Sequence, residues 1–274
     1  MTGYILFRFP ILSGGIGDMI KYFVCALDIS KQHNMNVCII EDENILSKYI
    51  ILNDKEMYKS SSFFKDFKHI YNISSINNIK TDIEANKKHN EDFVLQIVPS
   101  LFYDEPVYDI LKKYNLSDIF YFSSDVVNLS KKVCSTKDYV SIHIRRGDKF
   151  IETSSSFKAV PHDERPFNED KLTSIIEETH KETKDIHFFC DSMVFKKKIH
   201  KQHPFLTMTD FKIGHTSYMN TSDEQVLNTV CEFYILSQSK KIIANCKSGF
   251  STVATGFNNV PIIYYETDFV PSRY

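Results

Sequence analysis

The chain has 274 residues, of which 42% are hydrophobic and 25% are charged. This length allows one large domain or two domains that each bury a core, and the composition is that of a globular protein rather than of a disordered or fibrous one. The 33 basic and 35 acidic residues give a formal net charge of −2, so no overall positive field attracts nucleic acid or an acidic membrane.

The sequence predicts a soluble, cytoplasmic protein. The first residues, MTGYILFRFPILSGG, lack the charged region and the cleavage site of a signal peptide. No stretch approaches the roughly 18 apolar residues that a membrane span needs. The six cysteines are scattered without a CxxC pair, which favours reduced, structural thiols.

The first elements in chain order form a predicted β-α-β unit. Its strands are expected over residues 4–11 and 36–40, and its helix over 18–32. The turn between them, Ser13-Gly14-Gly15-Ile16-Gly17-Asp18, lies where glycines let a backbone approach a phosphate or a sugar. An ordinary tight turn, with Asp18 as an acid in the first helical turn, is the alternative, and the turn by itself favours that alternative.

The region up to residue 135 gives weaker patterns. Short strands are expected at 69–71 and 93–98, and a helix at 106–114. A serine- and lysine-rich stretch then precedes the next apolar strand, so we place a domain junction near residue 135. The predicted domains are 1–135 and 136–274.

The second half alternates regularly between apolar runs and amphipathic stretches. Strands are expected at 139–145, 186–190, 205–209, 241–245 and 261–265, and helices at about 167–183, 193–201, 223–238 and 249–257. This order is typical of an open, mostly parallel α/β sheet.

Strand alternation divides the segment His143-Ile144-Arg145-Arg146-Gly147-Asp148 between two faces. Arg145 falls on the polar face with Ser141 and His143, and reaches the carboxyl edge of the sheet, where α/β proteins bind ligands. Its guanidinium suits a diphosphate. Arg146 falls on the other face and is expected to pair with Asp148 or another carboxylate. An equal alternative makes both arginines surface charges after a buried strand.

Two further strand ends carry polar groups. Asp191 follows strand 186–190, where it can accept from ribose hydroxyls or cap the next helix. The stretch Asn245-Cys246-Lys247-Ser248-Gly249-Phe250-Ser251 begins a helix and offers backbone N–H groups and hydroxyls to an anion. A simple serine cap is the commoner meaning of such a stretch.

One helix carries a polar stripe, which by itself predicts a solvated face. The stripe consists of Gln225, Asn228, Thr229 and Glu232. The sequence contains no DxD triplet, no HExxH and no zinc-type Cys/His spacing, so no divalent metal is predicted.

Together these segments resemble the superfamily of α-1,2-, α-1,6- and protein O-fucosyltransferases. Its H-x-R-R-x-D motif is met by His143, Arg145, Arg146 and Asp148. The strand ending in Asp191, the helix segment led by Glu232 and the serine-rich turn 248–251 are similar to its other motifs. The glycine turn is similar to its G-G-[LI]-G-[ND] segment.

The resemblance implies an α/β fold of two Rossmann-like domains facing a cleft, the GT-B type of glycosyltransferase. It implies a metal-independent, inverting transfer of L-fucose from GDP-fucose to a hydroxyl of a glycan or protein acceptor, with no cofactor besides the donor. Glu232 would accept from N1 and N2 of guanine, and residues 248–251 would hold the diphosphate. The implied catalytic residues are Arg145, Glu152 as general base and Asp148. The implied donor-binding residues are Gly15, Gly17, His143, Arg145, Asp191, Glu232, Ser248, Gly249, Phe250 and Ser251.

Two alternatives stay open at this point. The donor could be another GDP-sugar, because the predicted contacts to base and phosphates do not read the sugar. The chain could also be a non-catalytic module that binds GDP or a glycan, although the presence of Arg145 together with Glu152 argues against this.

Overall fold

The computed structural model describes residues 2–10, 13–40, 45–73, 75–87, 91–103, 106–134, 138–151, 163–165, 167–216 and 221–266. The chain divides into two compact units, Met1–Tyr121 and Phe122–Tyr274. The sequence places the junction near residue 135, after helix α4 (Ser124–Val133), whereas the compact units divide before that helix. Helix α4 therefore belongs to the second unit.

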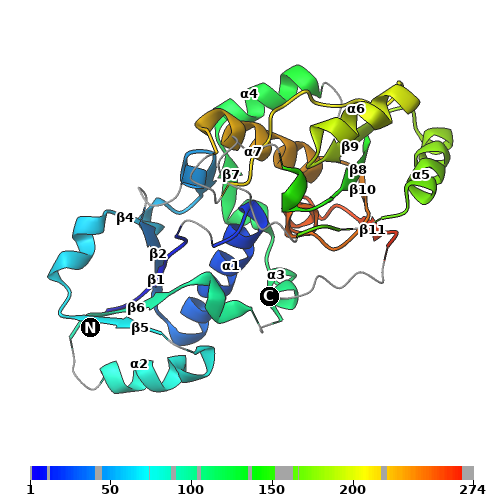
Figure 1. The fold of residues 1–274 in the computed structure, drawn as a ribbon. Coiled ribbons are helices and arrows are strands. Elements are labelled where there is room, and N and C mark those ends of the chain that lie inside the picture. The colour runs from blue at the N-terminus through cyan, green and yellow to red at the C-terminus, as the bar shows by residue number, and fades with distance from the viewer. Residues whose placement is uncertain are drawn as a thin grey trace. The chain divides into compact units, whose positions relative to one another are not determined.

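The first unit is built on a five-stranded sheet in the order β4-β2-β1-β6-β5, in which all paired strands are parallel (Figure 1). The strands are β1 (Gly3–Phe7), β2 (Asn36–Ile40), β4 (Tyr58–Lys59), β5 (His69–Asn72) and β6 (Phe93–Ile97). Helix α1 (Ile16–His33) connects β1 to β2, as the β-α-β prediction requires. Its buried ring of Phe23 packs against the rings of Phe7 and Phe120.

Short elements fill the rest of the first unit. A two-stranded sheet joins β3 (Ile50–Leu52) to β7 (Phe120–Phe122), and the helices are α2 (Ile79–Lys87) and α3 (Val107–Leu111). Short 3₁₀ turns separate them, for example Ser61–Asp66 and Pro99–Phe102. The predicted strands at 69–71 and 93–98 and the predicted helix at 106–114 correspond to β5, β6 and α3.

The second unit is built on a four-stranded parallel sheet in the order β11-β10-β8-β9. Its strands are β8 (Val140–Ile144), β9 (Ile186–Cys190), β10 (Lys241–Ala244) and β11 (Ile262–Tyr264). In the centre of the sheet, Ile142 of β8 is aligned with Ile243 on one side and with Phe188 on the other. The carboxyl ends of β8, β9 and β10 therefore lie at one edge.

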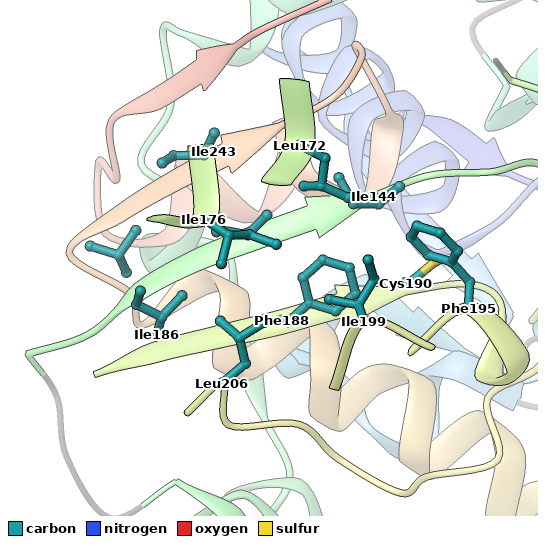
Figure 2. Packing of buried hydrophobic residues seen from close by; sticks show 12 residues of the cluster. Ile144, Leu172, Ile176, Ile186, Phe188, Cys190, Phe195, Ile199, Leu206 and Ile243 are labelled. Atoms are coloured by element: carbon teal, nitrogen blue, oxygen red, sulfur yellow. The ribbon is translucent and has the colours of Figure 1, made fainter. Parts of the chain in front are cut away.

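Helices cover both faces of this sheet. Helices α5 (Glu169–Glu182) and α6 (Met193–Gln202) contribute Leu172, Ile176, Phe195 and Ile199 to one apolar cluster with the strands (Figure 2). On the other face, α8 (Gly249–Ala254) places Phe250 over His143 of β8. Helix α7 (Asp223–Ser237) packs Phe233 edge-on against Phe250, with ring centroids 5.2 Å apart.

Side-chain caps fix where α5, α6, α7 and α8 begin. The residue before each of these four helices accepts a hydrogen bond from a backbone N–H in the first turn, which otherwise has no partner within the helix. These residues are Asn168, Ser192, Ser222 and Ser248.

The predicted strand at 205–209 is wrong, because only one residue of it pairs with the sheet. Thr207 forms a single parallel bridge to His187, with its N–H donating to Ile186 O at 2.9 Å and its carbonyl accepting from Phe188 N at 2.9 Å. The side chain of Thr209 then bonds to Lys196 at 2.8 Å. The chain leaves the sheet edge at that point.

Among the described residues, no helix is long and apolar enough to cross a membrane. All six cysteines are free thiols.

Candidate functional site

Arg145 follows the last residue of β8 and is held by three carboxylates. Its Nη1 lies 2.9 Å from Asp191 Oδ2, and its Nη2 contacts Asp148 Oδ1 and lies 3.5 Å from Asp163 Oδ2. Burial lowers the pKa of Arg145, but Asp191, Asp148 and Asp163 outweigh burial and raise it. A guanidinium has five N–H donors, so the Nε donor and one Nη1 donor stay available to a ligand.

Asp191 at the end of β9 holds the turn that follows β8. Its carboxylate accepts from the N–H of Arg146 at 2.9 Å and from the N–H of Gly147 at 2.8 Å. Burial raises the pKa of this carboxyl group, while Arg145 and the two N–H groups lower it. Asp191 therefore organises the turn, and its predicted contact with ribose stays a prediction.

Residues 163–165, which we call the strap, lie across the same turn. Arg165 N donates to Arg146 O at 2.7 Å, and Asp148 N donates to Asp163 Oδ2 at 2.9 Å. Gly147 has φ +116°, and a Cβ there would lie 2.0 Å from Asp163 O. Only glycine fits this close approach of two backbones. The strap leaves no signal in the sequence, because it has no periodicity and lies well beyond the end of β8 along the chain.

Arg146 points away from this cluster, as strand alternation predicts. Its guanidinium carbon lies 3.9 Å from the centre of the Phe150 ring and 5.0 Å from that of Phe195. The expected pairing with Asp148 is wrong, because Asp148 contacts Arg145 instead. Arg146 instead makes cation–π contacts with the rings of Phe150 and Phe195.

His143 lies on β8, two residues before Arg145 in the chain, and is 4% exposed. Its ring is stacked on Phe250 with centroids 5.5 Å apart, and its Nδ1 has no hydrogen-bond partner among the described residues. Burial, with the charges of Arg145 and Arg165, lowers its pKa to about 3. His143 is therefore neutral near pH 7 and offers one donor and one acceptor nitrogen.

The turn from β10 to α8 is fastened to the end of β8. The side chain of Asn245 accepts from Arg145 N at 2.9 Å and donates to Arg145 O at 3.0 Å. Ser248 accepts from Phe250 N at 3.3 Å, so it acts as a helix cap. The Ser251 hydroxyl is buried without a hydrogen-bond partner in the described residues. The predicted role of residues 248–251 in holding a diphosphate stays a prediction.

Glu232 does not lie on a solvated face, so that interpretation of the polar stripe is wrong. The residue is 2% exposed, and its Oε1 lies 2.8 Å from Lys196 Nζ and also accepts from the hydroxyl of Thr209. Both contacts use the same oxygen. The buried Lys196 was not predicted, because a lysine in an amphipathic helix usually lies on the surface.

The other polar residues of α7 hold an irregular segment against the helix. Asn228 donates to Lys212 O at 3.2 Å, and Thr229 Oγ1 accepts from Gly214 N at 3.0 Å. These side chains replace the partners that a sheet would provide for the backbone. The stripe is polar because it binds a peptide segment, not because it faces water.

Gly15 and Gly17 belong to the first unit, whereas the other described site residues belong to the second. Gly15 caps α1, and its N–H donates to Asp18 Oδ2 at 3.1 Å. Asp18 also pairs with Lys21 at 2.6 Å. This is the tight turn that the sequence favours, and the donor contacts of both glycines stay predictions. Glu152, the predicted general base, lies outside the described residues.

Within the described part of the chain, no group of three or more His, Cys, Asp and Glu side chains is arranged to hold a metal ion. Asp148, Asp163 and Asp191 surround the guanidinium of Arg145.

Comparison by sequence finds no matching family model and no matching curated relative. Comparison of the fold finds fucosyltransferases. NodZ from Bradyrhizobium is 11% identical, with a TM-score of 0.57 over 97% of this chain and 96% of NodZ. POFUT1 in complex with GDP is 13% identical, with a TM-score of 0.57 over 96% of this chain and 98% of POFUT1.

A mutant of Arabidopsis thaliana FUT1 in complex with GDP is 14% identical, with a TM-score of 0.52 over 99% of this chain and 73% of that protein. The predicted GT-B-type α/β fold is thus confirmed. This chain has the fold of fucosyltransferases whose structures were solved with GDP or GDP-fucose.

Proposed function

We propose that the protein is an inverting, metal-independent fucosyltransferase that transfers L-fucose from GDP-fucose to a hydroxyl group of a glycan or a protein. One observation carries the proposal. The backbone of Arg145 is tied through Asn245 to the turn that begins α8, and Asp191 holds its partly exposed guanidinium, in a fold whose solved examples include complexes with GDP and GDP-fucose. A cation beside a helix start is suited to a diphosphate.

Glu232 would recognise the guanine base of the donor. Its Oε1 is used by Lys196 and Thr209, and Oε2 has no partner among the described residues. Oε2 would accept from the N1 and N2 donors of guanine, which adenine does not offer in the same place. Lys196 would hold the carboxylate in position through Oε1.

In the proposed reaction the acceptor hydroxyl attacks the anomeric carbon while GDP departs. Arg145 and backbone N–H groups would stabilise the charge that develops on the diphosphate. The carboxylate of Asp148 is engaged by Arg145, so we propose Glu152 as the general base. Neutral His143 would be a donor-site contact rather than a cation.

The first test is thermal unfolding with GDP, with ADP, and with GDP plus a chelator. GDP at 100 times its dissociation constant should stabilise the protein by roughly 2.7 kcal/mol. ADP should have little effect, the chelator none, and Arg145→Ala should lose most of the gain. Equal stabilisation by ADP would contradict the role given to Glu232.

The second test is turnover of GDP-fucose against GDP-mannose, with transfer and donor hydrolysis both measured. Fucose release should exceed mannose release. Turnover of GDP-mannose alone would identify another GDP-sugar as the donor. Tight GDP binding without hydrolysis or transfer of either donor would favour the non-catalytic binding module.

We further propose that the protein acts in the cytoplasm, since its six thiols are free and reduced thiols are usual there. Non-reducing mass spectrometry of the purified protein should find six alkylatable thiols after unfolding. A disulfide-linked pair would contradict this location.

A further inference from the structure

Arg165 in the strap carries a guanidinium that the predicted donor site does not use. Its Nε lies 3.2 Å from Asp163 Oδ1, and its Nη1 lies 4.0 Å from the sulfur of Cys246, a weak acceptor. Among the described residues Nη2 has no acceptor. Only 16% of the side chain is exposed. A mostly buried guanidinium that is satisfied on one side can bind an anion on the other.

The strap fixes where this guanidinium lies. The backbone of Arg165 is bonded to Arg146 O at 2.7 Å, so its chain runs beside the end of β8. Its side chain reaches Cys246, which directly follows Asn245 and precedes the turn that begins α8. Burial and Arg145 lower the pKa of His143, and the charge of Arg165 adds to this effect. Burial raises the pKa of Cys246, and the charge of Arg165 offsets part of that rise. Arg165 is therefore at the same sheet edge as Arg145.

The charges at this edge favour a second cation in the site. The guanidinium of Arg145 contacts all three carboxylates of Asp148, Asp163 and Asp191. This cluster would repel a diphosphate if Arg145 were its only cation. The carboxylate that Arg165 contacts, Asp163, is one of these three. Arg165 thus reduces the negative excess where the phosphates of a donor would lie.

We infer that Arg165 is a second guanidinium of the donor site and binds the diphosphate of the nucleotide together with Arg145. The inference rests on the proposed function for the GDP-sugar, but the predicted contact is to the phosphates and not to the base. Phosphate oxygens would accept from Nη2 of Arg165 and from the remaining donors of Arg145. Asp163 would keep Arg165 oriented through Nε.

A purely structural role for Arg165 makes a different prediction. The backbone bond to Arg146 and the carboxylate of Asp163 already hold the strap in place. If the side chain only supported the strap, its loss would affect every ligand alike. If it binds phosphates, its loss would affect ligands in proportion to their phosphates.

The test is calorimetric titration of the full chain with GDP, guanosine, ADP and inorganic pyrophosphate. Arg165→Gln should weaken GDP and pyrophosphate roughly 10- to 100-fold, the range for hydrogen bonds to charged groups, and leave guanosine unchanged. Arg165→Lys keeps the charge without the fork and should lose less. Glu164→Ala is the matched control: it removes the 2.6 Å pair with Lys149 from the same strap and should change GDP binding less than about twofold.

Unchanged GDP affinity in Arg165→Gln would overturn the inference, and so would an equal loss for guanosine and GDP. If Arg165→Gln does not fold, the same comparison in Arg165→Lys decides the matter. If wild type binds ADP as tightly as GDP, the guanine assignment fails, while a loss of ADP and pyrophosphate binding in the variant upholds Arg165. If wild type binds no diphosphate, both proposals are wrong.

Discussion

The side chain of Arg145 is held in one orientation by neighbouring residues of the protein alone. Two of its nitrogens are fixed by Asp191 and Asp148, and its own backbone is clasped on both sides by Asn245. A guanidinium held in this way loses little side-chain entropy when an anion binds. These carboxylates also compete with a phosphate for the same guanidinium, so each one weakens the attraction of Arg145 for phosphate. The proposed second cation, Arg165, would offset this loss of attraction.

The buried pair of Lys196 and Glu232 permits a prediction about stability. Removing one partner leaves a buried charge unpaired, so Lys196→Met and Glu232→Leu should each lower the free energy of unfolding by about 3–5 kcal/mol. The double variant should lose much less than the sum, because no charge is left behind. Urea unfolding measures all three variants.

Exposed Lys197, the neighbour of Lys196 on the same helix, supplies the control. Lys197→Met should change stability by less than about 0.5 kcal/mol. Strictly additive losses in the double variant would show that the two buried side chains do not form a coupled pair.

His143 predicts how stability responds to acid. Its pKa is about 3 in the folded protein and roughly 6.5 in an unfolded chain. Between these values the unfolded chain binds a proton that the folded protein does not, so stability falls as the pH drops below about 6.5. His143 contributes at most about 1.4 kcal/mol per pH unit.

Replacement by an aromatic residue that keeps the stack on Phe250 isolates this effect. His143→Phe should have a shallower loss of stability between pH 6 and 4 than wild type, measured by urea unfolding at each pH. His200→Phe, at an exposed position on α6, should keep the wild-type slope. Parallel slopes in wild type and His143→Phe would contradict the neutral, buried state of His143.

At the scale of elements, the second unit was predictable because its signals are strong and local. Strands β8, β9 and β10 are mostly buried apolar runs, and helices such as α5 and α7 start at the side-chain caps Asn168 and Ser222. The first unit between residues 45 and 73 consists of 3₁₀ turns and of strands of two to four residues. Such pieces are too short for periodicity to reveal.

The residues of the candidate site differ in the same way: some lie in segments with strong local signals, and others do not. The sequence points to Arg145 and Asp148 as candidates because a strand and a compact motif carry them. The motif could not show that Asp163 and Arg165 return to the same turn, because such pairing between distant segments leaves no spacing to read. Lys196 was missed because only the folded structure shows a lysine turned inward to Glu232.

Helix α7 permits a prediction about the segment that it holds. Thr229→Val keeps the shape of the side chain and removes the acceptor for Gly214 N. Leaving that N–H without a partner should cost about 1–3 kcal/mol, and the Gly214 amide should exchange its hydrogen faster in mass-spectrometric exchange. Glu224→Ala, an exposed position in the first turn of the same helix, should change neither quantity. Unchanged exchange at Gly214 would show that this hydrogen bond does not hold the segment.

At the scale of the whole molecule, the described residues assigned to donor binding are concentrated in one unit. His143, Arg145, Asp191, Glu232 and residues 248–251 lie within Phe122–Tyr274, and only Gly15 and Gly17 lie within Met1–Tyr121. Each unit has a sheet and buried residues of its own. A unit with its own core can unfold as a separate cooperative step.

Hydrogen exchange of the intact chain with and without saturating GDP tests this division. A ligand protects the region that binds it, by up to roughly 2.7 kcal/mol at 100 times the dissociation constant. Protection should therefore be largest in peptides that cover β8, the strap, the start of α8 and the part of α7 around Glu232. Peptides from β2, β5 and β6 should change little, because no residue of these strands is assigned to the donor. Equal protection of both units would mean that donor binding is not concentrated in the second, and the site proposed at the end of β8 would then be incomplete.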